Sequence, residues 1–273
     1  MAEITVQRRL LSSKVWPRPV VLTPILGMLA FLALPWPLEH KAHVILHGLC
    51  AQRPSHTYYF GDRPLPFDAR MTGIYIGYLV TMIVLLANGA HRWCRPPSST
   101  RVAALMTLGG AMAADGFNSL LRDLTLPHPY QPHNWLRIVT GAGAGIVLAV
   151  ALCFLLSVTL WRTVDAQRQT LESWTTLVMA AVVATPLLLI STSGIGSLYA
   201  PTVLVLIFAA LVALTTLSLV VIVIVRKMEF RFSSAKQIEA VVIPAVVLAV
   251  GIMLGLSIGR TFLERWLGTS TLT

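Results

Sequence analysis

Charged side chains are scarce in this sequence, and acidic ones are the scarcest. Only 12% of the residues are charged, with 11 Asp and Glu against 21 Lys and Arg, whereas 56% are hydrophobic. Long stretches carry no charge at all, and the longest of these is residues 173–225. A composition this apolar excludes an ordinary soluble domain and indicates an integral membrane protein.

Cysteines and catalytic signatures are scarce as well. The three cysteines are too few for a disulfide framework. The chain has no phosphate-binding loop, no Gly-x-Ser-x-Gly elbow and no His-Glu-x-x-His pair. No basic run is interleaved with aromatic residues, so nucleic acid is excluded as a partner. We therefore expect a protein that is not an enzyme and that requires no cofactor, with a metal ion kept as an alternative.

Apolar segments of about 20 residues are long enough to cross a bilayer as helices. We expect about seven such spans, within a range of six to eight, and thus an all-α, polytopic transmembrane helix bundle formed as one domain by residues 1–273. The expected spans are 19–38, 71–90, 102–121, 137–160, 173–193, 201–225 and 238–259.

The Lys and Arg residues between the spans predict an orientation. With the N-terminus in the cytoplasm, 13 of them fall on the inner side and 8 on the outer side. This excess favours a cytoplasmic N-terminus in the inner membrane of a bacterium, with membrane lipids as partners. Residues 39–70 then form an extracytoplasmic loop between spans one and two. Its length predicts an ordered structure, with "FGDRP" as a turn between two short extended pieces.

A possible metal site begins that loop, in "HVILHGLCAQRP", residues 43–54. On a helix, the spacing of His43, His47 and Cys50 places all three on roughly one face. Imidazole and thiolate are ligands for zinc or another borderline-soft metal. The alternative is that these histidines bridge the apolar and wet layers at the membrane boundary and hydrogen-bond to the backbone.

One carboxylate, Asp115, is expected deep within a span. An intramembrane carboxylate is costly and marks a pairing or functional site. Asn118 lies one turn further along the same helix, and Arg70 and Arg137 stand at the mouths of neighbouring spans. We expect these residues, with Asn134, to form a structural polar network, with a proton relay or ligand site as the alternative.

Glycines recur at four-residue spacing in three of the expected spans. Such small-xxx-small ridges allow helices to approach closely. We expect the ridges in the second and fourth spans to be internal seams, while the ridge in the last span could equally contact another subunit. These helix-packing residues are Gly73, Gly77, Gly141, Gly145, Gly251, Gly255 and Gly259.

Two stretches resemble a family of bacterial and archaeal membrane proteins, the domain of unknown function 2085. They are "LCAQRPSHTYYFGDRPLPFDARMTGIYIGYLV" and "DGFNSLLRDLTLPHPYQPHNWLRIVTGAGAG", and the resemblance covers about residues 45–160. The family pattern implies a four-ligand metal or redox site made of a Cys-His pair and a Cys-x-x-Cys pair. This chain keeps the first cysteine as Cys50 but has Ala51, Asp68 and Met71 at the other three positions. Asp68 could still coordinate a metal as a carboxylate, together with the upstream histidines, but a degenerate metal site on a retained scaffold explains more.

These patterns favour a non-catalytic accessory or scaffold subunit of a bacterial membrane assembly. Its partners would be lipids and other membrane subunits, or a second copy of the chain in a homo-oligomer. The first alternative is a small-solute or ion transporter with a polar path at Asp115. The second is a metal- or redox-handling membrane protein that uses residues 43–71.

Overall fold

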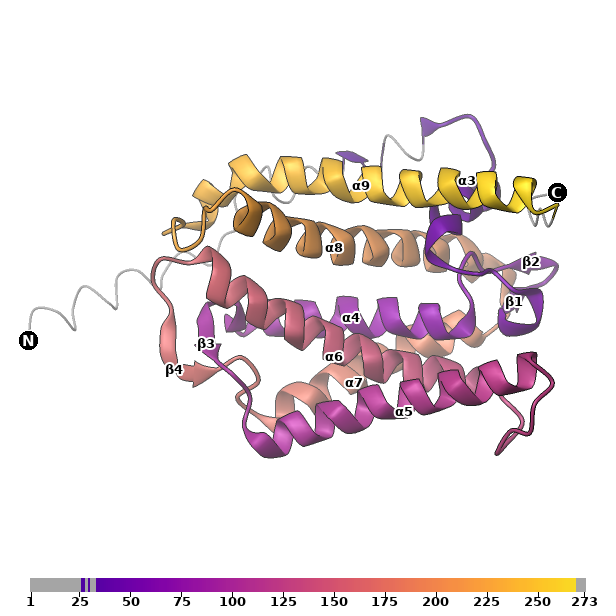
Figure 1. The fold of residues 1–273 in the computed structure, drawn as a ribbon, viewed down its shortest axis with the longest axis horizontal. Helices are drawn as coiled ribbons and strands as arrows, with labels where there is room; N and C mark the ends of the chain where they lie inside the picture. The colour runs from indigo at the N-terminus through magenta and orange to yellow at the C-terminus, as the bar shows by residue number, and fades with distance from the viewer. Residues whose placement is uncertain (1–25, 28, 30–32, 269–273) are drawn as a thin grey trace, which may run out of the picture.

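The computed structural model describes residues 26–27, 29 and 33–268. Its long helices run side by side along the long axis of the molecule (Figure 1). They are α4 (Ala69–Ala87), α5 (Ser99–Asp123), α6 (Asn134–Leu160), α7 (Trp174–Thr192), α8 (Tyr199–Val225) and α9 (Ala235–Trp266). The short elements are α3 (Leu38–Leu46), η1 (His47–Leu49), η2 (Pro54–His56), η3 (Ala90–Arg92), η4 (Gly196–Leu198) and the strands β1 (Tyr59–Phe60), β2 (Arg63–Pro64), β3 (Trp93–Arg95) and β4 (Asp165–Gln169).

Five segments of the described chain are long and apolar enough to cross a membrane: α4, α6, α7, α8 with its preceding η4, and α9. These segments confirm the helical membrane bundle in its coarse form. The α5 helix forms where the span 102–121 is expected, but its glycines together with Asp115 and Asn118 keep its hydropathy too low to place it among the five. The expected span 19–38 lies largely outside the described residues, so the count of seven stays a prediction.

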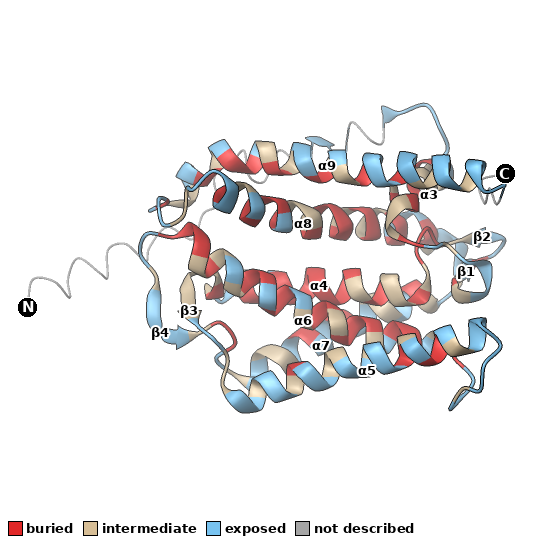
Figure 2. Ribbon diagram, viewed as in Figure 1, coloured by how far each residue is buried: buried red, intermediate tan, exposed pale blue. Residues whose placement is uncertain are grey.

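The α4 helix lies at the centre of the bundle, in contact with α6, α7 and α8. In its most apolar 18-residue window 72% of the residues are buried, compared with 17% for α7. α9 is also less buried than the central helices: Figure 2 shows α4 and α6 as mostly buried, whereas buried and exposed residues alternate along α9. α9 packs along α8, and α5 packs along α6.

Two separate clusters of buried apolar side chains form the core. The larger one gathers residues of α4, α6 and α8 with the loop side chains Phe60 and Phe67. The smaller one joins the ends of α6 and α8 to the start of α9, around Trp161, Phe232 and Ile238. The core therefore has a discontinuity between the two clusters, toward the end of the bundle where the smaller one lies.

Small strands distinguish the two ends of the bundle. At the hairpin end, β1 and β2 pair antiparallel, with Phe60 opposite Arg63, so "FGDRP" is the turn of a short hairpin. At the β3–β4 end, β3 pairs parallel with β4. The connection 226–234 lies at this second end, where Phe232 bridges to Trp161.

Candidate functional site

An ion pair between a partly buried arginine and a buried aspartate joins α4 to α5 near the hairpin end. Asp115 is 1% exposed, and one of its carboxylate oxygens accepts a hydrogen bond from Nη2 of Arg70 at 2.6 Å. The other oxygen accepts one from the hydroxyl of Tyr130 at 3.0 Å. Arg70 also donates to the hydroxyl of Ser119 at 3.2 Å. Protein donors therefore engage both oxygens of this carboxylate, as the cost of burying a charge requires.

Asn118 holds the connection between α5 and α6 against this pair. Its side-chain amide donates to the carbonyl of Tyr130 at 2.9 Å and accepts from the backbone N–H of the same residue at 3.3 Å. The two-way clamp positions the Tyr130 hydroxyl for its bond to Asp115. Asn118 and Asp115 lie on the same face of α5, as helical spacing predicts, and Tyr130 from the following loop hydrogen-bonds to both.

Arg137 lies beside this cluster but forms no ion pair with Asp115. It is 2% exposed and donates to Oδ1 of Asn134 at 2.8 Å and to Nε2 of His56 at 3.1 Å. Since a guanidinium can only donate, Nε2 of His56 must accept and is therefore unprotonated. Burial, and then the charge of Arg137, lower the pKa of His56. The residues of the predicted polar network thus lie in two adjoining sets of hydrogen bonds, one around Asp115 and one around Arg137.

The corner at residues 47–52 is clamped by the last turns of α9. His47 is fully buried, and its Nε2 lies 2.9 Å from a carboxylate oxygen of Glu264. Arg260 pairs with Glu264 at 2.7 Å and donates to the carbonyls of His47, at 2.7 Å, and Cys50. On the other side of the imidazole, Nδ1 of His47 lies 3.0 Å from the amide oxygen of Gln52. The corner is therefore a docking contact between the loop and α9.

Cys50 and Asp68 serve the backbone of this loop. Sγ of Cys50 accepts hydrogen bonds from the N–H groups of Gln52 and Asp68. Burial, and then the nearby charge of Asp68, raise the pKa of Cys50 to about 12. A carboxylate oxygen of Asp68 accepts from the N–H of Met71 at 2.8 Å, as the N-cap of α4. Both side chains therefore have hydrogen-bonding partners in the loop itself.

The weak metal site is not assembled within residues 33–268. No group of three or more His, Cys, Asp and Glu side chains lies close enough there to hold an ion. The Nδ1 atom of His43 bonds to the backbone carbonyl of Glu39 at 2.9 Å, as expected of a boundary histidine. His47, Cys50 and Asp68 have the separate partners described above.

The four glycines of α4 and α6 form one seam between these helices. A Cβ added at Gly73 would overlap the carbonyl oxygen of Ile138, and one added at Gly77 would overlap that of Ala142. Gly141 and Gly145 meet carbonyl oxygens of α4 in the same way. Only glycine permits this backbone approach, which explains why α4 is so deeply buried.

The glycines of the α9 ridge have the same four-residue spacing, but no neighbouring helix of the described chain packs against them. No atom of the described chain lies within 4 Å of a Cβ added at Gly251, Gly255 or Gly259. Ile258 (69% exposed) and Phe262 (73%) lie on the same face of the helix. Among the described residues nothing covers this ridge, and large apolar side chains flank it.

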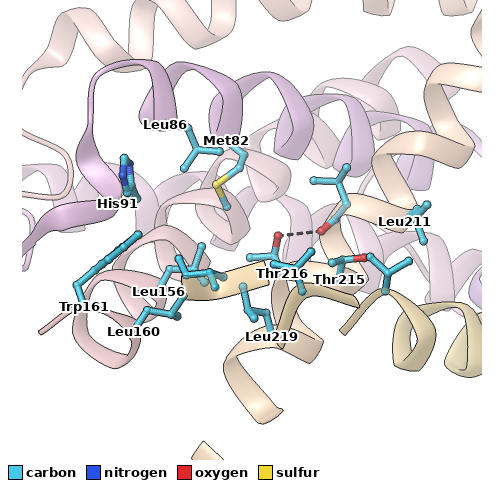
Figure 3. Close-up of a pocket in the computed structure, with 14 residues that line it drawn as sticks. Met82, Leu86, His91, Leu156, Leu160, Trp161, Leu211, Thr215, Thr216 and Leu219 are labelled. Carbon is cyan, nitrogen blue, oxygen red and sulfur yellow. Dashed lines mark hydrogen bonds between the residues drawn. The ribbon is translucent and has the colours of Figure 1, made fainter. Parts of the chain in front are cut away.

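An apolar groove lies between the two core clusters, at the β3–β4 end (Figure 3). Its volume is about 180 Å³, and α4, α6, α8 and α9 all contribute to its walls. His91 and Trp161 lie at one end of it and Leu211 at the other. The His91 ring lies 5.6 Å from that of Trp161, and burial, together with the charge of Arg92, lowers the pKa of His91 to about 4. No sequence pattern predicts this groove, because helices far apart in the chain line it.

Sequence reasoning also missed Tyr130, Arg260 and Glu264. Tyr130 reaches Asp115 from a loop, and no local pattern signals that contact. The other two have the i, i+4 spacing typical of a helical ion pair. That spacing would have extended the last helix beyond residue 259.

Comparison with known proteins matches one family model, described as "Predicted membrane protein (DUF2085)", to residues 50–151. This match confirms the family resemblance over the segment from Cys50 to the second half of α6. It includes Arg70, Asp115 and Asn118, while α7, α8 and α9 lie beyond it. No curated protein and no solved structure matches the chain. Together with the five apolar helices, the family description supports a membrane location.

Proposed function

We propose that this chain is a non-catalytic subunit of a bacterial membrane assembly, and that α9 is the helix on which a partner helix docks. The partner is a second copy of the chain or another membrane subunit. The observation that carries the proposal is the glycine ridge of α9, which no described residue covers.

The internal seam of the same protein is the strongest support for this role. Where Gly-xxx-Gly spacing occurs in α4 and α6, a neighbouring helix fills it with backbone. Glycine costs about 1 kcal/mol relative to alanine in a helix, and close helix contact is what offsets that cost in a membrane. Three glycines on one open face of α9 carry this cost without any contact inside the described chain.

The side chains around the ridge favour a docking face as well. Val247, Ile258 and Phe262 are between 66% and 73% exposed, and they flank the glycines along the helix. Large side chains beside a small-residue groove allow a second helix to interdigitate with the first. Trp266 continues the strip to the hairpin end and is 75% exposed.

The surroundings of Asp115 argue against the transporter alternative. A polar transport path requires the carboxylate to face a wet cavity, but Asp115 is buried and both of its oxygens are bonded to protein donors. The groove of Figure 3 lies at the other end of the bundle and is lined mainly by apolar side chains. The metal-handling alternative has no ligand cluster among residues 33–268 in its favour.

Site-specific cross-linking in native membranes tests the proposal. Cys94 is the one native cysteine that is not buried, so a Cys94→Ser background removes the main competing thiol. In this background, Ile258→Cys should give a discrete cross-linked adduct, whose mass tells a second copy from another subunit. Val182→Cys, on the exposed face of α7 (63% exposed), is the matched control.

We expect the adduct from Ile258→Cys alone, and we expect Gly255→Leu to abolish it by filling the ridge. Equal cross-linking from both cysteines would mean random encounter in the membrane. No adduct from Ile258→Cys would show that no partner subunit lies on the ridge, and either result contradicts the proposal.

A further inference from the structure

The groove between the core clusters has the shape and lining of a site for a linear apolar chain. Along α8 it runs from Leu211 to Leu219, which is roughly 12 Å at the rise of an α-helix. Its lining is mainly aliphatic, with Met82 and Leu156 facing it from α4 and α6. Nothing in this part of the groove carries a formal charge, so the interior suits hydrocarbon rather than a polar solute.

Two threonines supply hydroxyl groups on the α8 wall, and they differ in their partners. The Thr216 hydroxyl donates to the carbonyl of Val212 at 2.8 Å (dashed in Figure 3) and accepts from the hydroxyl of Tyr78 at 2.9 Å. Oγ1 of Thr215 is buried and has no hydrogen-bond partner among the described residues. Thr215 is therefore a position where the groove can be filled without breaking an internal hydrogen bond.

Basic residues surround the β3–β4 end of the groove. The guanidinium of Arg92 lies 4.2 Å above the ring of Trp161, which forms that end of the groove. The basic connection 226–234 is fastened at the same place, because the N–H of Phe232 donates to the carbonyl of Leu160 and the N–H of Arg162 donates to the carbonyl of Phe232. Arg92 donates to the carbonyl of Ser233 at 3.4 Å.

These contacts gather positive charge that carboxylates do not balance. Arg168 of β4 lies within 4 Å of Asp165 and Glu172. Other basic residues of this end have no carboxylate within 4 Å in the described part of the chain, and they include Arg92, Arg162, Arg226, Lys227 and Arg231. Glu229 is the one acidic residue of the connection 226–234. An apolar groove thus opens beside a cluster of cations.

We propose that the groove binds one acyl chain of an anionic phospholipid, with the lipid phosphate held by the basic residues at the β3–β4 end. A phospholipid of this class joins a long apolar chain to an anionic head group. The apolar groove would hold the chain, and the basic residues beside its β3–β4 end would hold the head group. The basic end is also the end that the distribution of Lys and Arg assigns to the cytoplasmic leaflet. This inference does not depend on the docking role of α9.

Lipid retention by the purified full-length chain tests the proposal. The protein is exchanged into detergent with equal amounts of phosphatidylglycerol and phosphatidylcholine of the same chain length, and native mass spectrometry counts the lipids that remain bound. Thr215→Phe fills the groove, and Thr215→Val, which keeps its volume, is the matched control. Lys227→Gln with Arg231→Gln removes charge at the basic end, and Arg265→Gln removes an exposed charge at the opposite end.

The proposal predicts that the wild-type chain retains one phosphatidylglycerol in preference to phosphatidylcholine. Each basic residue near an anionic lipid is worth about fivefold in affinity, so the double charge variant should lose up to roughly 25-fold of the preference. Thr215→Phe should lose the bound lipid, while Thr215→Val and Arg265→Gln should retain it. Should Thr215→Phe fail to fold, Val246→Phe fills the same groove from α9.

Three results would overturn the proposal. One is equal retention of the two lipids by the wild-type chain, which would show that the basic residues do not select an anionic lipid. Another is retention by a folded groove-filling variant at the wild-type level, which would mean that the lipid only adsorbs to the basic surface. The third is a co-purifying apolar molecule without a phosphate in place of the phospholipid.

Discussion

Alanine at Gly145 should destabilise the bundle, and alanine at Gly255 should not, although both glycines occupy the same kind of ridge. A Cβ at Gly145 would overlap the carbonyl oxygen of Ile74 and lie 2.7 Å from the backbone nitrogen of Tyr78. Both obstacles are backbone atoms, so no side-chain rotation relieves them and α4 must move away from α6. The same Cβ at Gly255 meets no atom of the described chain within 4 Å.

The size of the effect follows from two opposing terms. Overpacking that shifts the backbone costs about 3 kcal/mol, and alanine regains about 1 kcal/mol of helix propensity. Gly145→Ala should therefore lose about 2 kcal/mol, or roughly 4–8 °C in the thermal midpoint for a domain of this size. Gly255→Ala keeps the propensity gain alone and should be as stable as the wild type or slightly more stable.

Thermal unfolding of the monomeric protein in one mild detergent measures both variants against the wild type. The reasoning is refuted if Gly145→Ala melts at or above the wild-type midpoint. It is also refuted if Gly255→Ala falls as far as Gly145→Ala, since the two positions would then not differ in packing.

Three further predictions concern the charged and titratable groups. Asp115→Asn should cost about 3 kcal/mol of unfolding free energy, because it removes the buried carboxylate that pairs with the partly buried Arg70. Asp123→Asn, in an exposed pair, should cost about 1 kcal/mol or less, and equal losses in chemical unfolding would contradict the difference in burial between the two pairs. The pKa of His91 lies at about 4 in the folded protein, below its ordinary 6.5, so stability is full above pH 6.5 and falls by up to about 3 kcal/mol as the pH drops toward 4. His91→Gln should flatten this part of the pH profile, and an unchanged slope would refute the origin given for it. Glu264→Gln should speed amide hydrogen exchange in residues 47–52, because the carboxylate that pairs with the clamp is lost, and protection equal to the wild type would show that the clamp is dispensable.

The helices could be located from the sequence wherever apolar runs end in clear breaks. The charge-free run 173–225 is interrupted by "STSGIGSLYAP", and the structure places α7 at Trp174–Thr192 and α8 at Tyr199–Val225, within two residues of the expected spans. The last helix is the counterexample. It continues to Trp266, seven residues beyond the expected end, because Arg260 and Glu264 are polar and yet helical, held by their contacts with the loop corner.

For the polar site, the sequence allowed one prediction, namely that the buried carboxylate must pair with a cation. A buried carboxylate such as Asp115 needs a cation, and Arg70 and Arg137 were the two available near it; the structure pairs it with Arg70 alone. The tyrosine that binds its second oxygen comes from an irregular loop, and hydrophobic periodicity carries no information about such a segment. The groove is still less accessible to sequence reasoning, since it arises where two core clusters fail to meet.

The central claim, that the α9 ridge docks a partner helix, is tested most directly by native mass spectrometry of gently solubilised wild-type protein beside the Gly255→Leu variant. The account predicts that the wild-type chain carries a second subunit, either another copy or a different membrane protein, and that the folded Gly255→Leu chain is released as a monomer. A wild-type chain that is already monomeric, or a variant that keeps the same partner, would contradict it.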